Sequence, residues 1–158
     1  MPKALSSEEP WLRHIQDLSS RVWILHNNTL TAVPRKEQTV PATVTLLPCQ
    51  HLETLEKGKG GPMYLGVNTP RCCLFCTKDG EQPVLQLKPG SMLELYHQRE
   101  PAKPSIFYHS KNGTTSTFES AAFPGWFIAV GPKGSSPLFL TRELGKTFMT
   151  DFEMIVVP

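Results

Sequence analysis

The chain has 158 residues, a length that favours one domain able to bury about 70% of the surface that its unfolded form exposes. Hydrophobic residues make up 39% and charged residues 19%, and the 15 prolines and 11 glycines favour an all-β chain with many turns over long helices. A formal net charge of +2, with its basic residues scattered, argues against a nucleic-acid or heparin surface.

The N-terminal segment carries charged residues at short intervals between Met1 and Ser20 and lacks the apolar core of a signal peptide. No later segment has the length and hydropathy expected of a membrane span. Residues 1–10 are polar without an apolar pattern, so we expect a flexible segment there. Residues 11–158 are expected to form a single domain.

Apolar, β-branched and aromatic residues concentrate in short runs bounded by turn residues, which is typical of β-strands. The runs predict twelve strands, at 15–18, 21–25, 30–33, 43–47, 63–67, 72–77, 84–87, 106–110, 115–120, 127–130, 138–141 and 152–157.

Tight hairpin turns are predicted at four places, because Asn-Gly and Asp-Gly supply the positive φ angles that such turns need. These turns are Asn27-Asn28, Asp79-Gly80, Asn112-Gly113 and Lys133–Ser136. Turns at Asn27, Gly80 and Gly134 recur at intervals of 53 and 54 residues, about a third of the chain, which indicates a β-trefoil of three four-stranded repeats. Turns at Asn27, Thr69 and Asn112 give a competing spacing of 42 and 43, so periodicity leaves the fold open.

Three connections interrupt the strand pattern. Pro48–Pro62 carries charged residues around three glycines and is expected to be an exposed loop, as is Arg142–Thr150. Pro89–Tyr96 predicts one helical or 3₁₀ turn, with Met92, Leu93 and Tyr96 on one face, capping the barrel.

A Phe-Pro-Gly corner joins two short apolar strands within Phe118–Ala129. Proline presets a backbone angle, Gly125 permits the reversal, and Trp126 and Phe127 supply large apolar area directly after it. The run contains no group suited to catalysis, so it is interpreted as a feature of the fold, and function is expected to lie in surfaces.

Four cysteines offer a possible site for chemistry. Zinc ligands could be drawn from Cys49, His51, Cys73 and Cys76, but only one C-x-x-C pair is present, so buried reduced thiols typical of a cytosolic protein are the favoured interpretation. Motifs of metalloproteases, phosphate-binding loops, serine hydrolases and dinucleotide enzymes are missing, and the five histidines are spread singly. A Cys76–His109 nucleophile pair is speculative. We therefore expect no catalytic residue, metal, disulfide or cofactor.

The run Phe118–Ala129 resembles the signature of the interleukin-1 family, and Leu138 stands at the family's distance from it, whereas Val130 replaces the usual threonine. The resemblance extends over nearly the whole chain and is similar in detail to the interleukin-36 subgroup. The matching stretches are 15–17, 21–23, 32–35, 53–57, 64–66, 85–88, 95–96, 116–120 and 144–146, and the start at 3–5 agrees with one member of that subgroup.

This resemblance implies a β-trefoil cytokine that acts as a ligand and not as an enzyme. Members of the subgroup bind the interleukin-36 receptor and recruit the interleukin-1 receptor accessory protein, which activates NF-κB and MAP kinase pathways. It also implies a monomer that is cytoplasmic before release and is secreted by an unconventional route.

The resemblance further implies N-terminal processing and two receptor-binding loops. Trimming of the pro-segment is expected near Leu5 and Ser6, upstream of the motif that contains Ile15 and Asp17. The receptor-binding candidates lie in 53–61 and 142–151, and an acidic residue at the place of Asp151 is tied to the accessory receptor. These candidates are Glu53, Glu56, Lys57, Lys59, Arg142, Lys146, Phe148 and Asp151.

Other classes of protein stay open at this point. An antagonist of the same fold would bind the first receptor without recruiting the second. A carbohydrate-binding trefoil would carry Q-x-W repeats, which the chain lacks, and an inhibitor of proteases would be expected to carry a disulfide-braced loop. A thiol or zinc enzyme is the remaining enzymatic alternative.

Overall fold

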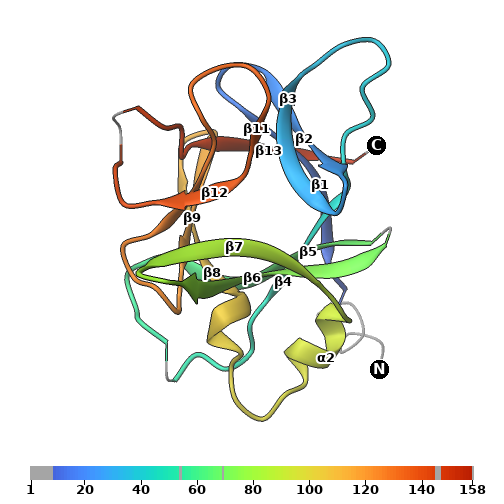
Figure 1. Ribbon diagram of the computed structural model, residues 1–158. Coiled ribbons are helices and arrows are strands. Elements are labelled where there is room, and N and C mark those ends of the chain that lie inside the picture. The colour runs from blue at the N-terminus through green and yellow to red at the C-terminus, as the bar shows by residue number, and fades with distance from the viewer. Residues whose placement is uncertain (1–8, 54, 69, 145–146, 158) are drawn as a thin grey trace.

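The computed structural model describes residues 9–53, 55–68, 70–144 and 147–157. Over these ranges the regular secondary structure is nearly all β-strand (Figure 1). The strands are β1 Trp11–Asp17, β2 Arg21–His26, β3 Thr29–Pro34, β4 Val44–Pro48, β5 Gly61–Asn68, β6 Arg71–Asp79, β7 Gln82–Pro89, β8 Ile106–Asn112, β9 Thr115–Ser120, β10 Phe127–Ala129, β11 Ser136–Pro137, β12 Phe139–Thr141 and β13 Phe152–Val156. The helices are α2 Met92–Tyr96 and the 3₁₀ turn η1 Lys103–Ser105, and none in the described part of the chain has the length and hydropathy to span a bilayer.

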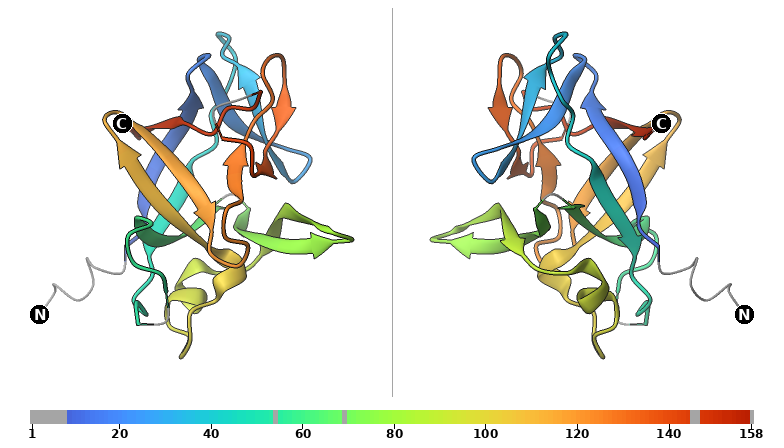
Figure 2. Two further views of the ribbon diagram at one scale, coloured as in Figure 1. Left: turned by 90° about the vertical axis from the view of Figure 1, so that its left-hand side faces the viewer. Right: turned by 90° about the vertical axis from the view of Figure 1, so that its right-hand side faces the viewer.

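Six strands close into a barrel, because β1 pairs with β4, β4 with β5, β5 with β8, β8 with β9, β9 with β13, and β13 with β1. Closure removes the free sheet edges of these strands. Three further antiparallel pairs, β2–β3, β6–β7 and β10–β12, are inserted between barrel strands at regular places in the chain. The β6–β7 hairpin projects clearly from the barrel in Figure 2. Three repeats of four strands make the predicted β-trefoil, so the spacing of 53 and 54 was the right one.

The centre of the barrel is filled by aromatic side chains from different repeats. Trp23, Phe118 and Phe152 are all 0% exposed, and the rings of Trp23 and Phe152 meet edge to face with centroids 5.1 Å apart. Phe118 lies 6.4 Å from each of the other two. Truncating such a side chain typically costs about 3–5 kcal/mol, so this cluster holds the first repeat, which supplies Trp23, against the third, which supplies Phe118 and Phe152.

The predicted hairpin turns have the expected backbone. Asn27 and Asn28 both take positive φ, at 51° and 61°, and Gly80, Gly113 and Gly134 take 70°, 67° and 73°. All twelve predicted strands are present, and the described residues form one more, which makes 13. The additional strand is β11, which pairs with β3, and its residue Ser136 was predicted to end the turn.

The short helix α2 covers one end of the barrel, against β4 and β5, as predicted. Met92 is buried, and Leu95 and Tyr96 pack with it on a second apolar cluster that includes Tyr64. Leu93 is 41% exposed, so the prediction that it shares the buried face is wrong. At 3.6 residues per turn the side chains three and four positions after Met92 share its face, whereas the next residue does not.

Candidate functional site

The Phe-Pro-Gly corner is fixed by two polar side chains at the end of β9. Glu119, 7% exposed, accepts the N–H of Gly125 at 2.8 Å, and Ser120 Oγ accepts the N–H of Phe123 at 3.0 Å. Gly125 has φ 88°, which confirms that glycine permits the reversal. The interpretation as a feature of the fold holds, but the sequence reasoning missed Glu119, whose bond to a backbone amide six residues on follows no short motif.

The segment 49–61 is only partly the exposed loop that the sequence predicted. Glu53, Glu56 and Lys57 are exposed, but Leu55 is 6% exposed and belongs to the second apolar cluster. The backbone N–H of Glu56 also donates to the hydroxyl of Tyr108 at 3.0 Å. A buried leucine and a buried tyrosine therefore hold the middle of the loop against β8, and its charged side chains are presented from a fixed base.

Lys59, a receptor-binding candidate, is turned toward the protein. Its Nζ lies 2.7 Å from Glu119 Oε2 and 3.7 Å from Glu56 Oε2. The hydrogen bond to Glu119 raises the pKa of Lys59 above its usual value, so the ammonium stays charged. Since Glu119 also holds Gly125, Lys59 ties the loop to the corner and its role in the structure is one of positioning.

The segment 142–151 is likewise more constrained than the predicted exposed loop. Met149 forms an antiparallel bridge with Val130, with both N···O distances at 3.0 Å, and Thr150 is 5% exposed. The ring of Phe148 meets Phe139 edge to face, with centroids 4.9 Å apart. Lys146 lies outside the described residues. Among the described residues of this loop, the exposed ones are 142–144 and 147.

Asp151 stands directly before β13 and is half-buried. Its carboxylate forms no hydrogen bond or ion pair with any residue in the described ranges. A side chain that capped the start of β13 would accept a backbone N–H there, and no such bond is made.

The two loops flank the same corner. Lys59 reaches the corner from the first loop through Glu119, and Arg142 reaches it from the second, with its guanidinium carbon 5.0 Å from the centroid of the Trp126 ring. Both segments lie along the left-hand side of Figure 1, with the corner between them. We call this combination of 53–61, 119–126 and 142–151 the corner surface.

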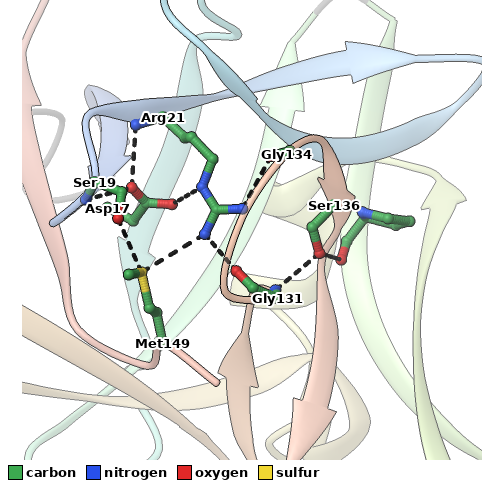
Figure 3. A network of polar contacts seen from close by, with 8 residues as sticks. Asp17, Ser19, Arg21, Gly131, Gly134, Ser136 and Met149 are labelled. Atoms are coloured by element: carbon green, nitrogen blue, oxygen red, sulfur yellow. Dashed lines mark hydrogen bonds and ion pairs between the residues drawn. The ribbon is translucent and has the colours of Figure 1, made fainter. Parts of the chain in front are cut away.

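The two motif residues of the expected processing region, Ile15 and Asp17, are buried, at 0% and 1% exposed. Asp17 Oδ1 accepts the N–H groups of Ser19 and Arg21 at 2.8 and 3.0 Å, and Oδ2 lies 2.8 Å from Arg21 Nε (Figure 3). The guanidinium of Arg21 in turn donates to the carbonyls of Gly131 and Gly134. Asp17 thus anchors the start of the domain, whereas Leu5 and Ser6 lie outside the described residues.

The four cysteines are buried free thiols, and burial raises the pKa of Cys73 and of Cys76 to about 11. In the described ranges no three His, Cys, Asp or Glu side chains gather as metal ligands. His51 contacts the carbonyl of Gln98 through Nε2. His109 bonds Ser116 Oγ at 2.7 Å and stacks on Phe118, and burial among these neighbours lowers its pKa.

Comparison with known proteins identifies the family to which this chain is similar. The family model described as Interleukin-1 / 18 matches residues 47–154. Interleukin-36 alpha of Mus musculus is 71% identical over 155 residues, covering 98% of this chain and 97% of that protein, and interleukin-36 alpha of Homo sapiens is 53% identical over 157 residues, covering 99% of both. A solved structure of the pro-inflammatory cytokine interleukin-36alpha, also 53% identical, aligns with a TM-score of 0.78 over 98% of this chain and 99% of that one.

A chicken interleukin-1 structure, 22% identical, aligns with a TM-score of 0.77 over 93% of this chain and 96% of that one, which supports the trefoil fold. The chain belongs to the interleukin-1 family, and it is a β-trefoil cytokine and not an enzyme. Within that family its relatives include the interleukin-36 alpha proteins, as the resemblance indicated.

Proposed function

We propose that this protein is an agonist that binds the interleukin-36 receptor and recruits the interleukin-1 receptor accessory protein, so that NF-κB and MAP kinase signalling begins. The observation that carries the proposal is the 71% identity with interleukin-36 alpha of Mus musculus over 98% of the chain. The ligand acts as a monomer outside the cell, after export by an unconventional route from the cytoplasm.

The corner surface is the proposed contact region. Glu53, Glu56 and Lys57 present charges from the first loop, and Arg142 presents one from the second. Because Leu55, Lys59 and Met149 fix the bases of these loops, their exposed residues lose little conformational entropy on binding. A rigid barrel with preformed loops is suited to two receptors that grip different parts of its surface.

Asp151 is proposed to engage the accessory receptor, because its carboxylate has no partner among the described residues. Substitution Asp151→Lys reverses a charge at an interface, which is expected to change recruitment of the second receptor more than binding of the first. We expect binding to the interleukin-36 receptor to stay within about threefold and the agonist concentration for half-maximal signalling to rise at least about tenfold.

Asp79→Lys is the matched control, since it makes the same charge change at the exposed end of β6, in the projecting hairpin. Surface plasmon resonance would measure binding, and an NF-κB reporter would measure signalling. If Asp151→Lys lost receptor binding and signalling to the same extent, the assignment of Asp151 to the accessory receptor would be contradicted.

N-terminal trimming near Leu5 and Ser6 is proposed to raise activity, because a polar overhang before the domain obstructs a receptor surface. The test compares the full chain with a form that starts at Ser6, on reporter cells with both receptors and on cells that lack the accessory protein. Accessory-dependent activation that is stronger for the trimmed form is the expected result.

An antagonist is the second candidate, because the interleukin-36 receptor antagonist protein of Mus musculus is 35% identical over 131 residues. Receptor binding without any reporter signal, for both forms, would establish that alternative. Failure to bind at all would overturn the proposed receptor.

A further inference from the structure

From the contacts of its sulfur we infer that Met149 is a redox modification site, at which a peroxide oxidises the thioether to a sulfoxide. Ser19 and Arg21 then donate hydrogen bonds to the sulfoxide oxygen. The modification would act on the segment that carries Asp151. Its effect on signalling rests on the proposed function, whereas the modification itself does not.

Two hydrogen-bond donors lie near the sulfur of Met149. Ser19 Oγ lies 3.7 Å and Arg21 Nη2 lies 3.6 Å from Sδ (Figure 3). A thioether is a weak acceptor, and both distances are at the long end for such contacts. The site therefore holds two donors that the unmodified side chain satisfies poorly, and a sulfoxide oxygen between them would accept both.

The other methionines in the described residues have different surroundings. Met63 and Met92 are 3% and 7% exposed and lie in the two apolar clusters. Met154 is half-buried and packs against the main cluster, as Met149 does, so it is the contacts of the sulfur that distinguish Met149 from it. None of these three makes a hydrogen bond through its sulfur to a described residue. Met149 is half-buried, so an oxidant reaches its sulfur more readily than that of Met63 or Met92.

The chemistry is a two-electron oxygen transfer. The sulfur lone pair attacks one oxygen of hydrogen peroxide, the O–O bond breaks, an S=O bond forms, and water leaves after a proton shift. Sulfur is oxidised and peroxide is reduced. The product is a polar, chiral side chain that can be reduced again by methionine sulfoxide reductases.

The position of Met149 gives the modification a structural consequence. Its backbone is fixed by the bridge to Val130, so the oxidised side chain must be accommodated where it stands. The same Nη2 that faces its sulfur also donates to the carbonyl of Gly131. A sulfoxide would compete with the carbonyl of Gly131 for that guanidinium edge, and would shift both the 131–134 turn and the side chains of the 147–151 segment, which contains Asp151.

The test treats the full chain with hydrogen peroxide and follows each methionine by peptide mass spectrometry. We expect Met149 sulfoxide to form at least about fivefold faster than the sulfoxides of Met63 and Met92, since oxidation follows access. In ¹H–¹⁵N spectra, oxidation should move the signals of Arg21 Nε–H and of the amides in 131–134 and 147–151.

Met149→Leu keeps an apolar side chain of similar volume and should abolish those spectral changes, whereas Met154→Leu should retain them. Oxidation of Met149 no faster than of Met63, or shifts that persist in Met149→Leu, would overturn the inference. If the unmodified protein gave no reporter signal but Met149 was oxidised with the expected spectral changes, the proposed function would be refuted and the modification site would be supported.

Discussion

Lys59 Nζ lies 2.7 Å from Glu119 Oε2, across 60 residues of chain. The same carboxylate oxygen accepts the N–H of Gly125, so one buried atom fixes both the first loop of the corner surface and the Phe-Pro-Gly corner. Lysine in a glycine-rich polar segment was expected to point to solvent. Here it supplies the counter-charge for a carboxylate that is 7% exposed.

Removing that counter-charge should destabilise the protein. Lys59→Met keeps the aliphatic stem and leaves Glu119 with only the amide of Gly125, and we expect the free energy of unfolding to fall by about 1–2 kcal/mol in urea denaturation. Lys57→Met, in the exposed part of the same loop, should change it by less than about 0.5 kcal/mol. Equal effects of the two substitutions would show that the Lys59–Glu119 contact contributes no stability.

Gly60 and Gly58 form a second matched pair in this loop. Both have positive φ, at 105° and 85°, but a Cβ on Gly60 would stand 2.3 Å from the carbonyl oxygen of His109, whereas one on Gly58 meets nothing within 4 Å. Gly60→Ala should therefore cost about 3 kcal/mol of stability, from strain plus a backbone clash, and Gly58→Ala about 1 kcal/mol. Thermal and urea unfolding would measure both, and a similar loss for the two would contradict the close approach to β8.

The strands could be predicted because their signals are local. Alternation and turn residues identify hairpins such as β2–β3, and positive φ at Asn27 and Gly80 follows from the chemistry of those residues. The trefoil itself needed one of two spacings to be preferred, and the family resemblance decided between them. The predicted strand boundaries differ from the observed ones by one or two residues at most ends and by four at the start of β1, and these differences do not affect the architecture.

The polar framework of the corner surface could not be predicted in the same way. Residue type indicates average exposure, so a charged residue such as Lys59 is interpreted as solvated unless its partner is known. The partner of Lys59 is brought to it by tertiary structure across 60 residues of chain, and no spacing rule connects the two. Met149 was missed for a similar reason, since its bridge to Val130 forms only when β10 and the last loop are in place.

The buried thiols should make stability fall at alkaline pH. Burial raises the pKa of Cys73 and of Cys76 from 9.0 to about 11. Between those values the unfolded chain has lost the thiol protons that the folded chain retains, so the free energy of unfolding decreases as pH rises. Each thiol should contribute a decrease on the order of 2 kcal/mol by pH 11.

Urea unfolding under reducing conditions at pH 8 and pH 10.5 would measure this effect. The double variant Cys73→Ala, Cys76→Ala is expected to be less stable at pH 8 because of the cavities, but to lose less stability between the two pH values. An unchanged pH dependence in the double variant would attribute the alkaline loss to other groups.

Substitutions of Arg21 test how much the buried Asp17–Arg21 network contributes to the stability of the protein. Its guanidinium spans Asp17 Oδ2 at 2.8 Å and the carbonyl of Gly134 at 3.0 Å, and it also reaches Gly131, which one lysine ammonium on a shorter stem does not reproduce. Arg21→Lys should lower the free energy of unfolding by about 2 kcal/mol, and Arg21→Met, which leaves Asp17 buried and unpaired, by about 4 kcal/mol. Arg35→Lys, at an exposed position, should change the free energy of unfolding by less than about 0.5 kcal/mol. If Arg21→Lys were as stable as Arg35→Lys, the several donors of the Arg21 guanidinium would contribute nothing beyond its charge.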